Sequence, residues 1–360
     1  MSGIMLVLDG MDDVEYDLLD GKTPYEFGKG SNFDRLESQA IKGEIRTIPY
    51  GFSSDTMVGM LSLFGVHPDK IPSGRSYLEA ASAGIKFAAD DLILRANFVK
   101  LDDHGNLENA FLLPTKQLLE QAKKCIMSVG LEMHYIGEYR SIIIAKGYKS
   151  YLDGLITHPP HQFIGESYDK ILPHGNSFAN ILQNIMNDLY IRTKSYSIVP
   201  WGESIYQKLP KFPAKAALIN KTAVVSGIAI EMGMENVNLC SSTGDIDTNL
   251  SDKAKIAMDK LIKNDIVVVH IGGTDEATHR KNPVEKAEFI GKIDRDIIGY
   301  FLDKLDNQGK LIVVSDHFAY CKNGGHGIDP VRFLLYKKGQ KPEKHGLLRN
   351  VSAYELLLRE

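Results

Sequence analysis

Short apolar runs that alternate with longer amphipathic segments constrain the fold of this chain most strongly. The clearest runs are rich in Val, Ile and Leu without polar alternation, and they span Ile4–Leu8, Ala216–Ile219, Ile266–Ile271 and Leu311–Ser315. Strands covered on both faces have this composition, because neither face meets water. The amphipathic segments predict helices at Thr56–Phe64, Ser177–Arg192, Ser251–Lys263 and Pro283–Leu305. This order predicts an α/β fold with a mostly parallel central sheet flanked by helices, and we expect Ser251 to be an N-cap.

The middle of the chain has a different pattern of shorter elements. It includes an amphipathic segment at Thr115–Ser128, a strand at Ser141–Ala145 and a linker-like segment at 157–161. A chain of 360 residues is long enough for two domains. We therefore expect residues 90–170 to form a smaller inserted α+β domain, and residues 1–89 and 171–360 to form a discontinuous core.

Charge and cysteine content indicate which binding partners and which cellular compartment to expect. The net charge is −4, from 42 Lys and Arg against 46 Asp and Glu, which gives no electrostatic reason to expect nucleic acid or an anionic membrane as a partner. No apolar run approaches the roughly 20 residues of a membrane span. The three cysteines, Cys125, Cys240 and Cys321, are far apart and odd in number. We expect reduced thiols and a cytoplasmic protein, whose oligomeric state the sequence leaves open.

Four features that can carry chemistry follow or close predicted strands, or precede a predicted helix. Asp9 comes directly after the first strand, and Ser54 lies just before the helix that begins near Thr56. The other two features are the pair Asp275 and His279, spaced to share one helical face, and the dipeptide Asp316-His317 with His326 in a glycine-rich segment after it. The carboxyl ends of strands are where α/β sheets place their sites.

Each of these features alone also has a structural explanation. A carboxylate after a strand is commonly a turn residue, and Ser54, Asp55 and Thr56 are all of types that cap helices. Together the features favour a functional interpretation. Mixed Asp and His ligands suit Zn²⁺ or Mn²⁺. Two such ions about 4 Å apart can hold a phosphoryl group and activate an oxygen nucleophile such as the hydroxyl of Ser54.

The order and context of these residues resemble the alkaline phosphatase superfamily, and in particular the archaeal-type cofactor-independent phosphoglycerate mutases. Further segments resemble that family along nearly the whole chain, among them residues 21–24, 64–68, 73–75, 94–98, 200–203, 243–249 and 328–331. The resemblance implies an alkaline-phosphatase-like core and a substrate that is a small phosphorylated metabolite. It also implies two divalent metal ions, with Mn²⁺ or Zn²⁺ favoured and Mg²⁺ as a further candidate.

The resemblance also implies a role for each site residue. One metal ion would be bound by Asp275, His279 and His326, and the other by Asp9, Ser54, Asp316 and His317. Ser54 would be the nucleophile, taking the phosphoryl group from 3-phosphoglycerate and returning it to the other hydroxyl to give 2-phosphoglycerate. The inserted domain would supply a lid and the groups that bind substrate.

One departure from the family pattern concerns the substrate. Members of the family carry an arginine cluster after the segment Arg95-Ala96-Asn97-Phe98, in the stretch that here begins at Asp102, whereas residues 107–113 contain no arginine. The remaining candidates for substrate binding are Arg75, Arg95, Arg140 and His161, each of which could instead serve in a surface ion pair or a structural role. The alternative function is a metal-dependent phosphatase, a phosphonate hydrolase, or a phosphotransferase to another small alcohol such as homoserine. A scaffold protein on a decayed enzyme fold is a third hypothesis.

Overall fold

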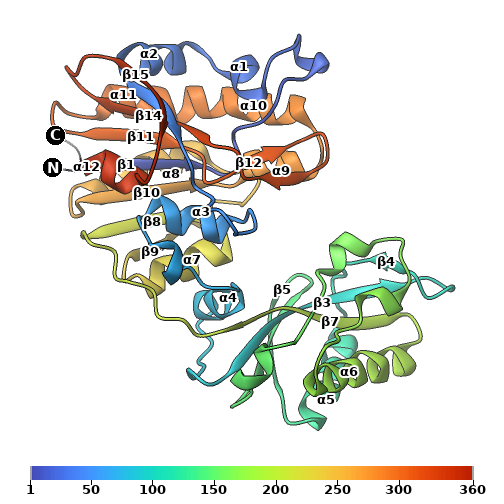
Figure 1. Ribbon diagram of the computed structural model, residues 1–360. Helices are drawn as coiled ribbons and strands as arrows, with labels where there is room; N and C mark the ends of the chain where they lie inside the picture. Colours follow the sequence, from blue (N-terminus) through green and yellow to red (C-terminus); the bar gives the residue numbers. More distant parts are fainter. Residues whose placement is uncertain (1, 359–360) are drawn as a thin grey trace. The chain divides into compact units, whose positions relative to one another are not determined.

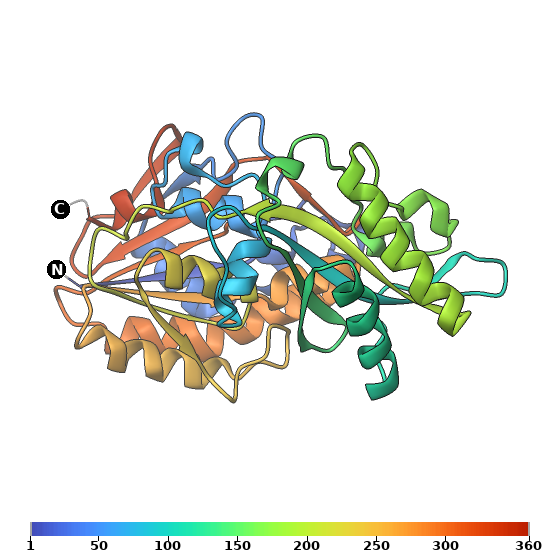
Figure 2. The same cartoon turned by 90° about the horizontal axis from the view of Figure 1, so that it is seen from below.

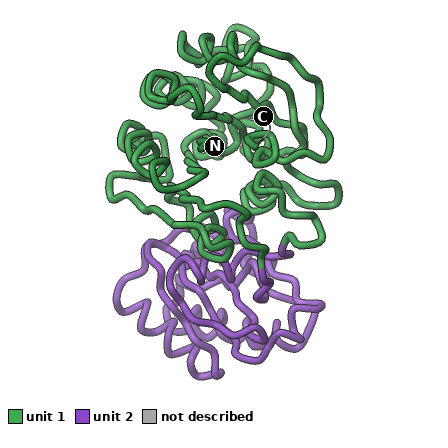
Figure 3. Tube along the Cα trace, turned by 90° about the vertical axis from the view of Figure 1, so that its left-hand side faces the viewer, with its two compact units in different colours: residues 1–71, 209–360 green, residues 72–208 purple. Residues whose placement is uncertain are grey.

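The computed structural model describes residues 2–358, which form two compact units. Unit 1 consists of residues 1–71 and 209–360 apart from the undescribed ends, and unit 2 consists of residues 72–208 (Figure 3). The expected insertion at residues 90–170 falls wholly inside unit 2, which extends further at both ends. The extension has a physical cause, because β7 pairs along most of β3 and helix α6 packs against β7. Neither partner of this pairing can be assigned to the other unit without breaking the sheet.

Unit 1 is built on an eight-stranded mixed sheet in the order β15-β2-β14-β11-β1-β10-β8-β9. Strand β1 lies between β10 and β11 and runs parallel to both, whereas β14 runs antiparallel to its two neighbours. The strands of this unit, including the small hairpin β12-β13, are β1 (Gly3–Leu8), β2 (Ile41–Ile45), β8 (Ala216–Asn220), β9 (Glu235–Asn238), β10 (Ile266–Ile271), β11 (Lys310–Val314), β12 (Phe318–Tyr320), β13 (Gly325–Gly327), β14 (Val331–Lys337) and β15 (Glu343–Leu348).

Helices cover both faces of this sheet. Alternate residues of β1 and β10 form one core with α2, α8, α10 and α11, and Figures 1 and 2 show α8 in gold beside α10 and α11 in orange. Helices α3, α7 and α12 belong to the opposite face. The helices of unit 1 are α1 (Pro24–Gly28), α2 (Ser31–Gln39), α3 (Thr56–Leu63), α7 (Ala223–Glu231), α8 (Leu250–Leu261), α9 (Gly273–His279), α10 (Pro283–Ile293), α11 (Gly299–Lys304) and α12 (Ala353–Leu358).

Unit 2 contains a five-stranded antiparallel sheet in which β3 pairs with β4, β6 and β7. Helices α5 and α6 pack together over one face of it and bury its apolar residues. The elements of this unit are α4 (Ser76–Ser82), β3 (Leu92–Leu101), β4 (Leu107–Asn109), α5 (Lys116–Ser128), β5 (Glu132–Gly137), β6 (Arg140–Ala145), α6 (Ser177–Thr193) and β7 (Tyr196–Ile205).

The predicted fold class is confirmed, with helices on both faces of a mostly parallel sheet and a separate α+β unit. Two details were wrong. The N-cap of α8 is Asn249, whose side chain accepts from the N–H of Asp252, so Ser251 is already inside the helix. The helix expected from Pro283 to Leu305 is interrupted by a π-helical turn at Asp294–Ile298. Within residues 2–358 no helix is both long enough and apolar enough to cross a membrane.

Candidate metal centre

Three parallel strands deliver acidic and imidazole side chains to one edge of the unit 1 sheet. Asp9 follows β1, Asp316 and His317 follow β11, and helix α9 follows β10. Because the strands are parallel, their carboxyl ends meet at this edge. The turn after Asp9 requires glycine, since Gly10 has a φ of 58° and a Cβ atom there would lie 2.9 Å from an oxygen of Asp275.

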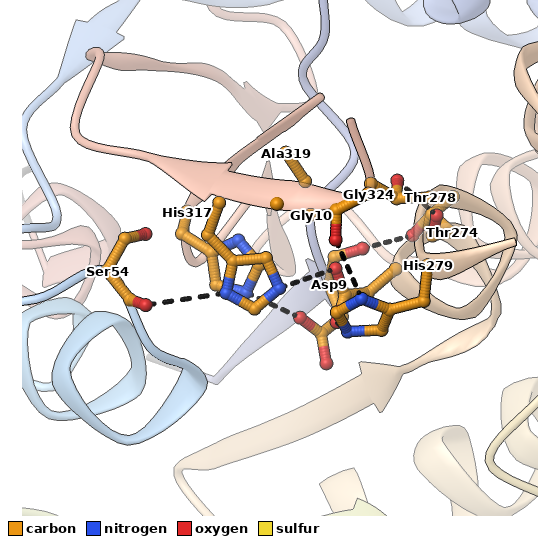
Figure 4. Close-up of polar contacts among 12 residues, drawn as sticks. Asp9, Gly10, Ser54, Thr274, Thr278, His279, His317, Ala319 and Gly324 are labelled. Carbon is orange, nitrogen blue, oxygen red and sulfur yellow. Dashed lines mark hydrogen bonds and ion pairs between the residues drawn. The ribbon is translucent and has the colours of Figure 1, made fainter. Parts of the chain in front are cut away.

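Ser54 reaches the same edge from the start of helix α3. The N-cap of this helix is Asp55, which accepts from the N–H of Met57 at 2.7 Å, so Ser54 is not needed as a cap. The Ser54 hydroxyl donates to the carbonyl of Gly327 at 2.8 Å, and its own carbonyl lies 3.4 Å from Nδ1 of His326 (Figure 4). The hydroxyl is therefore beside the edge without being used to hold the helix.

The start of α3 is packed tightly against the end of β11. A Cβ atom at Gly59 would lie 2.2 Å from the carbonyl oxygen of Asp316, which is a clash with backbone. Only glycine lets the helix approach this closely. The contact fixes the distance between the helix that carries Ser54 and the strand that carries Asp316 and His317.

Asp275 faces two imidazoles. Its Oδ2 is 3.1 Å from Nε2 of His279, one helical turn later on α9, and its Oδ1 is 3.1 Å from Nε2 of His326 on β13. The i, i+4 spacing that the sequence predicted for Asp275 and His279 is confirmed as a shared face of α9. Asp275, His279 and His326 have ligand atoms close enough to surround a single ion.

Asp9 lies between two further imidazoles. Its Oδ1 is 3.1 Å from Nε2 of His317, and its Oδ2 is 3.2 Å from Nε2 of His270. The ring of His317 stacks on that of His326 at a centroid distance of 4.0 Å, which joins this group to the group around Asp275. All seven residues predicted to form the site are therefore brought to one edge of unit 1.

Six buried polar atoms of this cluster have no hydrogen-bond partner among the described residues. They are Asp9 Oδ1, His270 Nε2, Asp275 Oδ1, Asp316 Oδ2, His317 Nε2 and His326 Nε2. A buried polar atom without a partner costs about 1–3 kcal/mol. Carboxylate oxygens and imidazole nitrogens that converge without bonding one another have the lone pairs of a metal site. The donor set therefore fits divalent cations.

Electrostatics in the cluster show how its charges balance without a cation. Burial lowers the pKa of His317, but the carboxylates of Asp316, Asp9 and Asp275 outweigh it and raise that pKa to about 10. Asp275 raises the pKa of His279 to about 9. Burial, followed by the charge of Asp9, raises the pKa of Asp316 well above its usual range. Protons thus compensate the carboxylates at the positions where metal ions would lie.

The pKa values of Asp9 and Asp275 are shifted in the opposite direction, below the usual range. Burial raises the pKa of Asp9, as does the charge of Asp275, but the imidazoles of His270 and His317, at 3.2 and 3.1 Å, hold it well below the usual range. Burial also raises the pKa of Asp275, and its contacts with His279 and His326 outweigh that effect. Both side chains are anionic at neutral pH, as metal ligands must be.

His270 is the member of the cluster that the sequence prediction missed. It lies in β10, the run Ile266–Ile271 that was treated as uniformly apolar, and it is 1% exposed. The available signal was a single imidazole in an otherwise apolar strand, five residues before Asp275. A buried histidine needs a partner for its nitrogens, so its position was informative.

The four predicted substrate-binding residues all lie in unit 2, where rings and ion pairs connect them. Glu79 of α4 lies 3.4 Å from Nε of Arg75 and 3.1 Å from Nε of Arg95. The guanidinium of Arg95 lies 4.0 Å from the centroid of the Trp201 ring. His161 contacts the same ring edge-on at 5.6 Å. These contacts join Arg75, Arg95 and His161.

Arg140 is joined to this group through two more rings. Its guanidinium lies over Tyr139, Tyr139 packs edge-on against Phe111, and Phe111 stacks with His161. Arg140 also pairs with the exposed Glu138 at 2.9 Å. We call this set the arginine ladder; it comprises Arg75, Glu79, Arg95, Trp201, His161, Phe111, Tyr139 and Arg140.

Comparison with known proteins identifies the family. A family profile described as "Metalloenzyme superfamily" matches residues 1–358. A 2,3-bisphosphoglycerate-independent phosphoglycerate mutase of Methanosarcina barkeri is 30% identical, over 94% of this chain and 90% of its own. The chain belongs to the metalloenzyme superfamily, within the family of the archaeal 2,3-bisphosphoglycerate-independent phosphoglycerate mutases. The resemblance noted from the sequence is thereby confirmed.

Other relatives agree with this assignment. A protein of Methanothermobacter thermautotrophicus named 2,3-bisphosphoglycerate-independent phosphoglycerate mutase 2 is 29% identical, over 94% of this chain and 89% of its own. Among solved structures, a Pyrococcus horikoshii protein has a TM-score of 0.79 at 24% identity, covering 99% of this chain and 96% of its own. The cofactor-independent phosphoglycerate mutase of Thermoplasma acidophilum has a TM-score of 0.57 at 21% identity, covering 94% and 91%. Membership of this superfamily and the donor set together indicate that the chain binds divalent metal.

Proposed function

We propose that this protein is a metal-dependent, 2,3-bisphosphoglycerate-independent phosphoglycerate mutase that interconverts 3-phosphoglycerate and 2-phosphoglycerate through a phosphoserine at Ser54. The observation that carries the proposal is the cluster at one strand edge of six carboxylate oxygens and imidazole nitrogens without hydrogen-bond partners. The Ser54 hydroxyl lies beside this cluster. The names of the relatives support the substrate.

In this proposal two ions share the cluster. Asp275, His279 and His326 hold one, and Asp9, Ser54, Asp316 and His317 hold the other. Imidazole ligands in both sets favour Zn²⁺ or Mn²⁺ over Mg²⁺, which prefers oxygen. When bound, the ions stabilise negative charge on the phosphoryl oxygens and lower the pKa of the serine hydroxyl.

The chain's own groups define the steps. Ser54 gives up its hydrogen bond to Gly327, and its Oγ attacks phosphorus while the bond from phosphorus to the glycerate oxygen breaks. The proton that Ser54 loses is transferred to the released glycerate oxygen. The other glycerate hydroxyl then attacks the phosphoserine, and its proton is transferred to Ser54 as the serine oxygen leaves. Water must be excluded between the two steps, because hydrolysis of the phosphoserine would turn the mutase into a phosphatase.

Unit 2 is proposed as the lid and substrate-binding domain. The arginine ladder offers Arg75, Arg95, Arg140 and His161 to the carboxylate and phosphate of a small phosphorylated metabolite. Planar guanidinium groups can bind such anions through two parallel N–H donors. Two of these arginines already share Glu79, so a substrate anion would compete with that carboxylate for them.

One observation favours the alternative of a phosphatase, a phosphonate hydrolase or a phosphotransferase to another alcohol such as homoserine. Residues 107–113, where the family carries arginines, form the short strand β4 and its continuation, and the side chain of Leu107 is buried. Asp102 closes the preceding turn by accepting from the N–H groups of His104 and Asn106. This stretch has no arginine with which to clamp an anion.

The test is a ³¹P NMR assay of the Mn²⁺-loaded protein with 3-phosphoglycerate, following both 2-phosphoglycerate and free phosphate. The wild type should form 2-phosphoglycerate without added bisphosphoglycerate. Ser54→Ala should reduce kcat by at least about 10³-fold, as expected for loss of a nucleophile. The matched control is Ser53→Ala, an exposed neighbour that should leave kcat unchanged. Full activity of Ser54→Ala would rule out the phosphoserine, and release of phosphate without isomerisation would establish the alternative.

A further inference from the structure

His270 shares a sheet face with the two carboxylates that end the neighbouring strands. In the parallel register Val7 lies opposite both His270 and Val314. Side chains two residues apart point to the same face of a strand. Asp9 lies two residues after Val7, and Asp316 lies two residues after Val314. The backbone therefore directs His270, Asp9 and Asp316 toward the same side of the sheet.

The side chains converge on that face. Nε2 of His270 lies 3.2 Å from Oδ2 of Asp9, while the other oxygen of Asp9 faces His317. His270 is 1% exposed and Asp316 is fully buried. Ligand atoms of His270, Asp9 and Asp316 all lie within 4.8 Å of one another. This group shares no residue with the one formed by Asp275, His279 and His326, to which Asp9 is linked through His317 and Asp275.

Nε2 of His270, which points into this group, lies close to Asp9 but does not have the geometry of a hydrogen bond. Nε2 of His270 and Oδ2 of Asp316 both lack a partner among residues 2–358, although both are shielded from solvent. An imidazole N–H that served only to orient Asp9 would be expected to point along the N···O line at hydrogen-bond geometry. A nitrogen lone pair and two carboxylates that meet without bonding one another can all be satisfied by a cation.

The side chain of a buried lysine holds the backbone of His270 in place. The ladder between β10 and β8 ends at Val269, so the carbonyl of His270 has no strand partner on that side. Nζ of Lys253, a residue 1% exposed, donates to this carbonyl at 2.9 Å instead. A buried ammonium that closes the strand end keeps the imidazole at a fixed position, as a ligand site requires.

We propose that His270 is a metal ligand, binding through Nε2 the same ion that Asp9 and Asp316 hold. The inference rests on the proposed two-ion function and adds a residue to one of its two sites. That site then has two imidazoles, from His317 and His270, in addition to two carboxylates and the Ser54 hydroxyl. With two imidazole ligands, this site should prefer Zn²⁺ or Mn²⁺ over Mg²⁺.

The experiment follows the histidine nitrogens directly. Protein labelled with ¹⁵N in its histidines is stripped of metal and titrated with Zn²⁺, and the imidazole signals are read by NMR. The His270 signals are assigned by their loss in His270→Gln. Zinc should shift Nε2 of His270 and leave its proton on Nδ1, together with shifts for His279 and His326. The exposed His104 of unit 2 serves as the internal control and should not shift.

The outcomes separate this inference from the proposed function. Zinc-dependent shifts at His279 and His326 with a protonated, unshifted Nε2 at His270 would overturn the ligand role while leaving the two-ion proposal in place. No response from any of these three histidines would overturn both. An anomalous-difference map of the zinc-loaded wild type needs no variant, and should place density about 2.0–2.1 Å from Nε2 of His270.

The variant His270→Gln distinguishes a metal-binding role of His270 from a role in which it only orients Asp9 by a hydrogen bond. The amide nitrogen of Gln lies near the position of Nε2 and can still donate to Asp9, but it is a poor metal ligand. We expect His270→Gln to lose at least about tenfold in zinc affinity, the lower end of the loss seen for an outer-shell partner of a ligand. An affinity within threefold of the wild type, in a variant with the same circular dichroism spectrum, would contradict the ligand role.

Discussion

The metal centre of unit 1 and the arginine ladder of unit 2 both concentrate charge, but they satisfy it differently. At the strand edge of unit 1, six buried oxygen and nitrogen atoms that could bind a metal ion have no hydrogen-bond partner in the described chain. In the ladder, Glu79 pairs with both Arg75 and Arg95, and the indole N–H of Trp201 donates to Asn97 at 3.0 Å. Two ladder atoms, Arg95 Nη1 and Arg140 Nε, also lack such a partner, but they are not accompanied by converging carboxylates and imidazoles. The atoms of the first region can be satisfied by a cation, whereas the charged groups of the ladder are held by contacts within unit 2.

This difference has a thermodynamic consequence. Unsatisfied buried atoms reduce the stability of the metal-free fold, and a cation that binds only the folded state restores it. The ion pairs within unit 2 contribute their free energy without a metal ion. Metal should therefore control the stability of unit 1, while single substitutions should control that of unit 2.

The largest expected effect is that of removing metal. At a free metal concentration a thousand times the dissociation constant, binding stabilises the folded state by about 4 kcal/mol. Treatment with a chelator should increase amide hydrogen exchange in β1, β10 and β11, whose ends carry the ligands. Peptides from β3 and β6 of unit 2 should exchange at the same rate in both states. Equal changes in the two units would remove the distinction between them.

The parts of the metal centre that the sequence predicts are those with a local signature. Strands β1, β10 and β11 are apolar runs, so the residues that follow them could be recognised as lying at one edge of a sheet. The spacing of Asp275 and His279 is a helical period. The three-dimensional proximity of Ser54 and His326 could be inferred only from family resemblance, because no local rule links positions 272 residues apart.

Other parts could not be predicted, for identifiable physical reasons. β2 and β15 are rich in charged and glycine residues, as edge and near-edge strands can be, so neither forms an apolar run. The boundary of unit 2 depends on β7 pairing with β3 across about a hundred residues, and strand partners are not encoded locally. The role of His270 was hidden because the apolar residues around it dominate the pattern of β10.

The second prediction tests the internal pairing of the ladder. Glu79→Gln leaves Arg75 and Arg95 without their shared carboxylate, and the side chain of Glu79 is only 5% exposed. Breaking a buried ion pair by removing one partner costs roughly 3 kcal/mol or more. We expect urea denaturation to show this loss, with bound metal unchanged by elemental analysis. Glu138→Gln is the matched control, because the carboxylate it removes is 69% exposed and pairs with Arg140 at the surface; it should cost less than about 1 kcal/mol.

A smaller effect is expected from altering the contact between α3 and the metal centre. Gly59→Ala adds a Cβ atom that would lie 2.2 Å from the carbonyl oxygen of Asp316, so the helix must shift. Such overpacking typically costs 1–3 kcal/mol, and we expect about 2 kcal/mol together with weaker metal binding. Gly346→Ala, where a Cβ atom would meet nothing within 4 Å, should change stability by less than about 0.5 kcal/mol. Unchanged metal affinity in Gly59→Ala would show that α3 does not position the site.

The smallest expected change in free energy, per pH unit, is that of metal binding. In the metal-free protein the pKa of His279 is raised to about 9 and that of His317 to about 10, so both imidazoles are protonated at neutral pH. A metal ion can bind them only by displacing those protons. Affinity should therefore rise with pH up to about 9, by roughly tenfold per unit for each proton released, or about 1.4 kcal/mol.

Calorimetric titration with Zn²⁺ in buffers of different ionisation enthalpy measures this proton release. His279 and His317 should each release a proton at pH 7 in the wild type, so the number released should fall by one in His279→Gln, which removes a single protonated ligand. The ladder provides the contrast, since a guanidinium group is not deprotonated in proteins and has no proton to release to a competing metal ion. A zinc affinity that is constant between pH 6 and 8 would mean that the carboxylates of the cluster are balanced by something other than protons on His279 and His317.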